Sequence, residues 1–253
     1  MRSRRGIFVA PFDELSDPRV IARLAAAAEE KGFDGFFVWD HVNYRPPTRA
    51  VADPWVAMSA IATATERVLI GPLVTPLSRR RVQKLARETA TLDLLSGGRL
   101  VFGVGLGSTD NGELEPFGEV VDPRERAQLL DEGLDRLVQF WDGEFEPRPL
   151  QQPRIPVWVA ARWPNKRPMR RAARWDGLFP IDQEEPAQLE EMVAYVSEHR
   201  PEDAGGPFEI VVDMPPGTDP EPWERAGATW FLTGFGQTPT EAEVRTAIDA
   251  GPG

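Results

Sequence analysis

Cysteine is absent from the 253-residue chain, and histidine occurs only twice, as His41 and His199. The absence of cysteine excludes disulfide bonds, thiolate catalysis, iron–sulfur clusters and cysteine-ligated zinc. Two histidines are too few for a histidine-rich metal centre. We therefore expect no metal site.

Basic residues are also in deficit, because 29 Lys and Arg face 40 Asp and Glu and give a net charge of -11. This charge argues against nonspecific binding to nucleic acid or to an anionic membrane. No apolar run approaches the roughly 18 residues of a spanning helix, and the apolar stretch after Arg5 is too short for a signal peptide. We expect a cytoplasmic protein whose partner is a small-molecule substrate.

Proline is abundant, with 25 residues, yet apolar periodicity persists between the prolines. Asp17-Pro18 and Asp53-Pro54 combine an N-cap with a proline at the first helical position and so predict two helix starts. The alternation of apolar runs with helical patterns favours one domain, residues 1–253, folded as a closed (β/α)8 TIM barrel, over an open doubly wound sheet. The eight predicted strands lie at residues 6–10, 34–39, 68–74, 100–106, 157–161, 177–181, 208–214 and 229–233.

The most informative stretch runs from Thr91 to Ser108. It predicts a helix closed by Gly97 and Gly98 and then a buried strand. Alternate residues of that strand and its exit are glycine, which is explained either by a tight barrel interior or by the close approach of a cofactor. The spacing is not that of a Rossmann dinucleotide fingerprint. These alternating glycines are Gly103, Gly105 and Gly107.

The carboxyl ends of barrel strands carry the chemistry of such folds, and His41 directly follows the strand at residues 34–39. A neutral imidazole there can act as acid, base or hydrogen-bond donor, although a lone histidine is as often a hydrogen-bonded loop residue. Asp40 either orients the ring or caps a turn. His199 lies among charged residues at a helix end and is expected at the surface.

A basic segment, residues 162–174, follows the predicted fifth strand and contains six Arg or Lys residues. Cations at a helix amino terminus oppose the helix dipole unless an anion is bound there. Asn165, Lys166 and Arg167 therefore form a candidate phosphate site, whereas the later arginines can simply coat the helix. Residues 79–81, all arginine, follow the third strand in the same way, and a solvated loop is the simpler interpretation of them.

The segments that carry a family resemblance are residues 30–41, 66–76, 88–107, 155–161 with 171–177, and 226–232. Together they resemble the bacterial luciferase-like monooxygenase superfamily, whose members bind FMN or the deazaflavin coenzyme F-420 in a (β/α)8 barrel. The third segment is the most specific and reads Glu88-Thr-Ala-Thr-Leu-Asp-Leu-Leu-Ser-Gly-Gly-Arg-Leu-Val-Phe-Gly-Val-Gly-Leu-Gly107.

The resemblance implies that His41 lies near the reactive edge of the flavin ring, with Asp40 beside it as a second catalytic candidate. It also implies that Leu73, Val74 and Thr75 form a bulge, often with a non-proline cis peptide, against which the ring packs. The segment after the fifth strand would bind the phosphate. Further cofactor-binding candidates by the same resemblance are Gly105, Leu106, Gly107, Ala160 and Ala161.

The chain departs from its apparent relatives at several positions. Deazaflavin-dependent sugar-phosphate and alcohol dehydrogenases of the superfamily have a glutamate where this chain has Ser108. Luciferase has an arginine at the position of Leu106, and a glycine pair is common where Ala160 and Ala161 stand. Many relatives also carry an inserted lid that this shorter chain lacks.

We predict a flavin- or deazaflavin-dependent oxidoreductase in which His41 is a proton donor or hydrogen-bond partner and the cofactor does the redox chemistry. Coenzyme F-420 is weakly favoured over FMN, and a homodimer is expected because relatives are often dimers. A noncatalytic flavin-binding barrel is the alternative, and it would bind cofactor without turnover. A metal-dependent hydrolase or aldolase would instead place magnesium at Asp40, Asp182 and Asp213.

Overall fold

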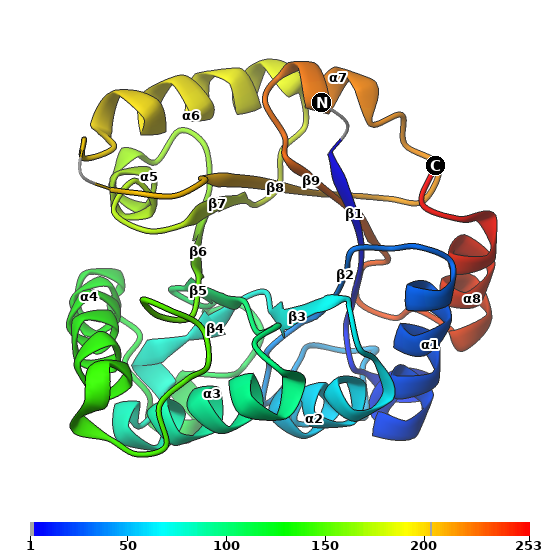
Figure 1. The fold of residues 1–253 in the computed structure, drawn as a ribbon, viewed down its shortest axis with the longest axis horizontal. Coiled ribbons are helices and arrows are strands. Elements are labelled where there is room, and N and C mark those ends of the chain that lie inside the picture. The colour runs from blue at the N-terminus through cyan, green and yellow to red at the C-terminus, as the bar shows by residue number, and fades with distance from the viewer. Residues whose placement is uncertain (1–2, 203) are drawn as a thin grey trace.

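The computed structural model describes residues 3–202 and 204–253. Its strands are all parallel to their neighbours and form a ring enclosed by helices (Figure 1), which confirms the predicted barrel. Around the ring the order is β3-β2-β1-β9-β8-β7-β6-β5-β4. The strands are β1 (Arg4–Val9), β2 (Gly35–Val38), β3 (Leu69–Pro72), β4 (Thr75–Pro76), β5 (Phe102–Gly105), β6 (Val157–Ala161), β7 (Gly177–Pro180), β8 (Glu209–Met214) and β9 (Trp230–Gly234).

The strand predicted at residues 68–74 is interrupted, so eight predicted strands appear as nine segments. Strands β3 and β4 flank the peptide bond between Leu73 and Val74, which is cis, as the resemblance implies. Ile70 pairs in parallel with Leu100, and β4 pairs with the end of β5. The split strand therefore lies along β5 at both ends and closes the ring.

The helices are α1 (Pro18–Glu30), α2 (Pro54–Ala64), α3 (Val82–Ser96), α4 (Pro123–Gln139), α5 (Lys166–Ala172), α6 (Pro186–His199), α7 (Glu221–Arg225) and α8 (Glu241–Ala250). The predicted caps are confirmed, since the Asp17 and Asp53 side chains accept hydrogen bonds from backbone N–H groups of α1 and α2. Gly97 ends α3 with a φ of 69°. The sequence pattern from Lys166 to Trp175 is helical, but α5 ends at Ala172 and the chain continues in turns to Trp175. Within the described residues no helix has the length and apolarity needed to cross a membrane.

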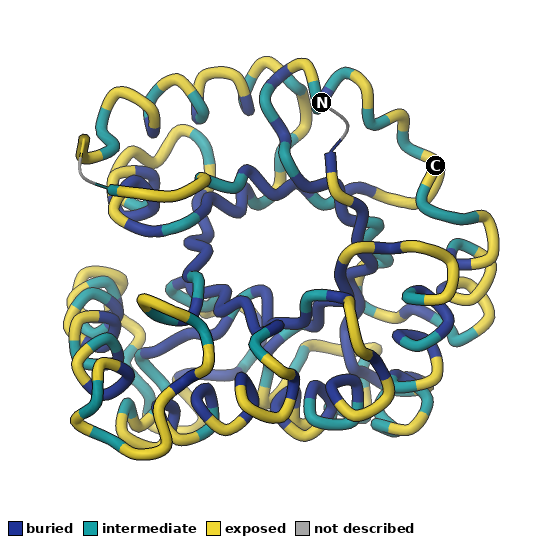
Figure 2. Tube along the Cα trace, in the orientation of Figure 1, coloured by how far each residue is buried: buried dark blue, intermediate teal, exposed yellow. Residues whose placement is uncertain are grey.

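The barrel interior is filled by aromatic rings that pack where glycines leave room. The strands around it appear in Figure 2 as a ring of mostly buried residues. Phe37 and Trp158 have ring centroids 5.4 Å apart. An ideal Cβ on Gly35 would lie 2.5 Å from the Phe37 ring, and one on Gly177 would lie 2.5 Å from Trp158. Side chains at these glycines would overlap the rings, so the glycines are required by packing.

The alternating glycines of β5 have the same origin. An ideal Cβ on Gly103 would lie 2.2 Å from the carbonyl oxygen of Pro72, and one on Gly105 would lie 2.8 Å from Val74. Of the two explanations considered from the sequence, the tight barrel interior accounts for the missing side chains.

The amino end of the barrel is held by the buried side chain of Arg99. Its guanidinium donates hydrogen bonds to the carbonyl groups of Ala62, Thr65, Val68 and Ser96, at 2.6–3.0 Å. These bonds join the ends of α2 and α3 to the start of β3. They lie at the end opposite the strand termini that carry the candidate site.

Candidate active site

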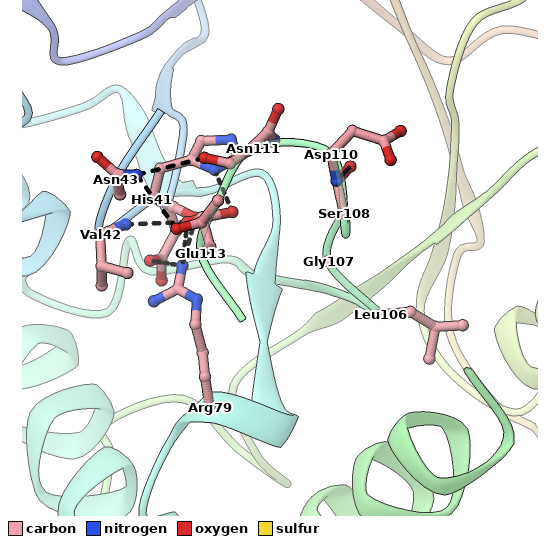
Figure 3. A network of polar contacts seen from close by, with 12 residues as sticks. His41, Val42, Asn43, Arg79, Leu106, Gly107, Ser108, Asp110, Asn111 and Glu113 are labelled. Carbon is pink, nitrogen blue, oxygen red and sulfur yellow. Dashed lines mark hydrogen bonds and ion pairs between the residues drawn. The ribbon is translucent and has the colours of Figure 1, made fainter. Parts of the chain in front are cut away.

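We call the carboxyl-end face of the strands the mouth of the barrel. His41 lies there, just after β2, and Glu113 reaches it from the loop that follows β5 (Figure 3). Nδ1 of His41 is 2.7 Å from Oε2 of Glu113, and the backbone N–H of Val42 donates to the other carboxylate oxygen at 2.9 Å. The side chains are 18% and 1% exposed, respectively.

The hydrogen bond to Glu113 determines what His41 can do. A carboxylate only accepts hydrogen bonds, so Nδ1 carries the proton and donates it. In the neutral ring, Nε2 is then the free base, and among the described residues it has no hydrogen-bond partner. The ring can accept a proton at Nε2, or donate one there once it is protonated.

Aromatic side chains surround the His41 ring. Tyr44 lies edge-on with a centroid distance of 4.8 Å, Trp39 at 5.7 Å and Phe12 at 5.9 Å. Trp39 and Tyr44 are partly exposed, whereas Phe12 is buried. His41 is therefore placed on an aromatic wall and not in a solvated loop.

Asp40 does not orient the His41 ring, contrary to one of the two roles considered for it, because Glu113 takes that place. Its carboxylate is buried and accepts hydrogen bonds from Thr75 at 2.6 Å, Arg79 at 2.8 Å and Arg80 at 2.7 Å. The interpretation of Arg79 and Arg80 as a solvated loop is wrong, since their side chains are only 3% and 14% exposed.

Two arginines and two carboxylates thus balance next to His41. Burial by itself would raise the pKa of Asp40, but the charges of Arg80 and Arg79 and the hydrogen bond from Thr75 outweigh it and hold the pKa below its usual value. Arg79 also lies 3.6 Å from Glu113. With all four groups ionised the cluster carries no net charge, and its contacts fix the loop geometry next to His41.

The break between β3 and β4, at Leu73 and Val74, borders the barrel interior. Leu73, Val74 and Ala160 belong to the interior cluster, where Val74 is partly exposed and lies against Gly105. Thr75 is fully buried, and its hydroxyl donates a hydrogen bond to Asp40. These residues give the mouth a compact apolar edge.

Other cofactor candidates face away from this edge. The side chains of Leu106 and Ala161 pack in the outer cluster, against the helices. The carbonyl groups of Leu106 and Gly107 accept hydrogen bonds from Arg126 of α4, both at 2.9 Å. The structure therefore places the Leu106 and Ala161 side chains in the packing between barrel and helices.

The basic segment divides into two groups. Asn165 is the N-cap residue of α5 and its side chain makes no capping bond, while the Lys166 ammonium lies 5.3 Å from the centre of the Tyr195 ring. Arg171, by contrast, is buried and pairs with Asp131, so it docks α5 onto α4. Arg167 and Arg170 are exposed and have no ion pair within the described residues.

Glu113 is the residue of the candidate site that the sequence did not suggest. It lies in an irregular segment without periodicity, 72 positions from His41. Asn43 ties this segment to the loop after β2 by donating to the Gly112 carbonyl at 3.1 Å. Only the fold brings the two loops together (Figure 3).

Comparison with known proteins covers nearly the whole chain. A family model described as luciferase-like monooxygenase matches residues 6–243. An uncharacterised protein of Mycobacterium tuberculosis is 31% identical over an alignment 269 residues long, which covers 91% of this chain and 91% of the relative.

Two relatives with named activities match about half of this chain. An F420-dependent glucose-6-phosphate dehydrogenase of Nakamurella multipartita is 36% identical over 135 residues, covering 50% of this chain and 38% of the relative. The oxygenase component of a flavin-dependent trigonelline monooxygenase of Acinetobacter baylyi is 29% identical over 142 residues, covering 51% and 39%. Among solved structures, an F420-dependent secondary alcohol dehydrogenase in complex with an F420-acetone adduct has a TM-score of 0.81 at 19% identity, covering 98% of this chain and 97% of that one, and it supports the fold.

Proposed function

The chain belongs to the luciferase-like monooxygenase family, and from this premise we propose that it is a flavin- or deazaflavin-dependent oxidoreductase acting on a small organic substrate at the barrel mouth. The observation that carries the proposal is His41, whose Nδ1 is fixed by Glu113 and whose Nε2 is free. A buried carboxylate that holds an imidazole in one tautomer is a typical arrangement for proton transfer.

The residues of the mouth fit a flat cofactor that bears a phosphate. The edge formed by Leu73, Val74 and Ala160 is apolar, as a flavin ring requires, and Arg167 offers a cation that no carboxylate neutralises within the described residues. We propose that the ring lies on this edge, bordered by the backbone of Gly105 and Gly107. When bound, FMN or coenzyme F-420 supplies the redox chemistry. The residues proposed for the phosphate are Asn165, Lys166 and Arg167.

The protein's own part is to position and to move a proton. Proton uptake at Nε2 of His41 creates an imidazolium that the Glu113 carboxylate, 2.7 Å from Nδ1, stabilises. The protonated ring can then donate the proton from Nε2 to a basic atom of the substrate. Such proton transfer contributes about 10²- to 10⁴-fold to a rate. Asp40 acts indirectly, because its carboxylate accepts hydrogen bonds that hold Arg79 and Arg80 beside the site.

Between the two cofactors we favour coenzyme F-420, since the F420-dependent dehydrogenases that match this chain are 32–36% identical to it, whereas the flavin-dependent trigonelline monooxygenase is 29% identical. The glutamate that such dehydrogenases have at the position of Ser108 is missing, but Glu113 supplies a carboxylate to the histidine from five residues further on. This contact argues against the noncatalytic barrel.

Equilibrium binding tests the proposal. Oxidised and reduced FMN and F-420 are titrated into the protein and followed by tryptophan fluorescence. We expect one cofactor to bind with a dissociation constant below about 50 µM, near -6 kcal/mol, and Arg167→Ala to weaken it about tenfold. Arg170→Ala, about one turn further along α5 and also exposed, is the matched control. The proposal fails if neither cofactor binds at this concentration.

We further propose that residues 1–253 act as one domain, in the cytoplasm and as a homodimer. Sedimentation equilibrium tests the dimer. A monomer at the concentration of the binding assay would contradict it.

A further inference from the structure

Asp213 is a carboxylate at the mouth that the proposed proton transfer does not use. It lies near the end of β8, two residues after Val211, whose side chain is in the barrel interior. Because side chains alternate along a strand, Asp213 also faces inward. An ideal Cβ on Gly234, two residues after the interior residue Leu232 of β9, would lie 3.1 Å from its Oδ2.

The Asp213 carboxylate has no hydrogen bond or ion pair with another residue in the described part of the chain. Burial, and then the charge of Asp182, raise the pKa of Asp213 to about 6. Asp182 follows β7 and is itself paired with Arg162, which follows β6, at 2.8 Å. The neighbouring strand β9 adds no charged side chain at this level. Asp213 is partly exposed, and its carboxylate is thus left without a counter-charge.

Aromatic side chains line the barrel interior next to Asp213. Gly234, which lies against the Asp213 carboxylate, pairs with Phe8 of β1, and the centroid of the Phe8 ring is 6.0 Å from that of Trp39, one of the rings around His41. Asp182 acts on Asp213 and also on Tyr44, whose pKa is raised by burial first and then by the Glu113 and Asp182 charges, against the lowering effect of Arg45. Trp39 packs on the interior cluster that also contains Val211. An unpaired carboxylate in an interior lined by aromatic rings is a combination that holds an organic ammonium group, by charge and by cation–π contact.

We propose that Asp213 is a specificity-determining residue that binds a protonated amine of an apolar, ring-bearing substrate. The inference rests on the proposed function only in taking this ligand to be the substrate. A bound cation supplies the counter-charge that the Asp213 carboxylate lacks, and it offsets the repulsion between Asp213 and Asp182. A phosphate or carboxylate group at the same place would add a third negative charge, so acidic substrates are disfavoured.

Fragment binding to the cofactor-free protein tests the inference. Benzylamine, benzyl alcohol and benzoate share one ring and differ in charge, and each is titrated at pH 8 by calorimetry. We expect benzylamine to bind about 10- to 100-fold more tightly than benzyl alcohol, as a charged hydrogen bond implies, and benzoate to bind most weakly. Asp213→Asn is expected to remove the advantage of the amine and to leave benzyl alcohol unchanged. Asp142→Asn, an exposed carboxylate after α4, controls for net charge.

Two results would overturn the inference. The first is that the wild-type protein binds benzylamine no more tightly than benzyl alcohol. This result requires no variant. The other is an amine preference that survives in Asp213→Asn but is lost in Asp182→Asn, which would assign the amine to Asp182. Because no cofactor is present, failure of FMN and F-420 to bind would refute the proposed function and leave this result standing.

Discussion

Replacing Asp213 by Asn should stabilise the protein at neutral pH. The folded protein raises the pKa of this carboxyl from 3.8 to about 6, and each tenfold change in ionisation is worth about 1.4 kcal/mol. The ionised carboxylate therefore costs up to about 3 kcal/mol of folding free energy. A raised pKa means that stability is fully present below pH 3.8 and is lost as the pH rises through about 6. Asparagine has nearly the same shape and does not ionise.

Urea unfolding of wild type and Asp213→Asn between pH 4 and 8 measures this difference. We expect the two proteins to be equally stable near pH 4 and the variant to gain about 2–3 kcal/mol above pH 7, or about 5–10 °C in melting temperature for a chain of this size. Asp142→Asn, with an exposed side chain, should follow the wild-type curve. A variant that is less stable than wild type at pH 8 would show that Asp213 has a partner, and the reasoning would fail.

Three further changes test other parts of the structure by chemical denaturation. Glu113→Gln removes the charge facing His41 and Arg79 and should cost about 1–3 kcal/mol, whereas Glu115→Gln in the same loop, exposed, should change stability by less than about 0.5 kcal/mol. Gly103→Ala should cost at least about 2 kcal/mol, because its Cβ would meet the Pro72 carbonyl at 2.2 Å; a neutral effect would contradict the interpretation of the β5 glycines. Arg99→Met leaves buried carbonyl groups unpaired and should cost about 3 kcal/mol or more, with exposed Arg170→Met as the control.

The elements of the fold could be read from the sequence because their signals are local. A cap such as Asp53-Pro54 needs only the next two residues to donate to it, and Gly97 can adopt its positive φ wherever the helix stops. The cis bond between Leu73 and Val74 came from the resemblance, since nothing local in that apolar strand indicates it. For the same reason the strand was predicted to be continuous.

The candidate site was predicted only in part, because its contacts join distant loops. His41 was found from its place after a strand, but Glu113 lies 72 positions away and Asp40 is 39 and 40 positions from the arginines that hold it. A run of three arginines is solvated in most loops. Here the side chains of Arg79 and Arg80 are mostly buried because the buried carboxylate of Asp40 pairs with them. Periodicity reports which face of an element is buried and not which loop meets it.

The ring nitrogens of the two histidines provide the most direct test of the account. In long-range proton–nitrogen NMR spectra of ¹⁵N-labelled protein, the imidazole signals come only from His41 and His199. His199, which is stacked on Tyr195 at the end of α6, is an internal reference. We predict that neutral His41 carries its proton on Nδ1 and that FMN or F-420 shifts its Nε2 signal and leaves His199 unchanged. A cofactor that binds without moving the His41 signals would contradict the proposal that this histidine is the proton-transfer residue at the cofactor.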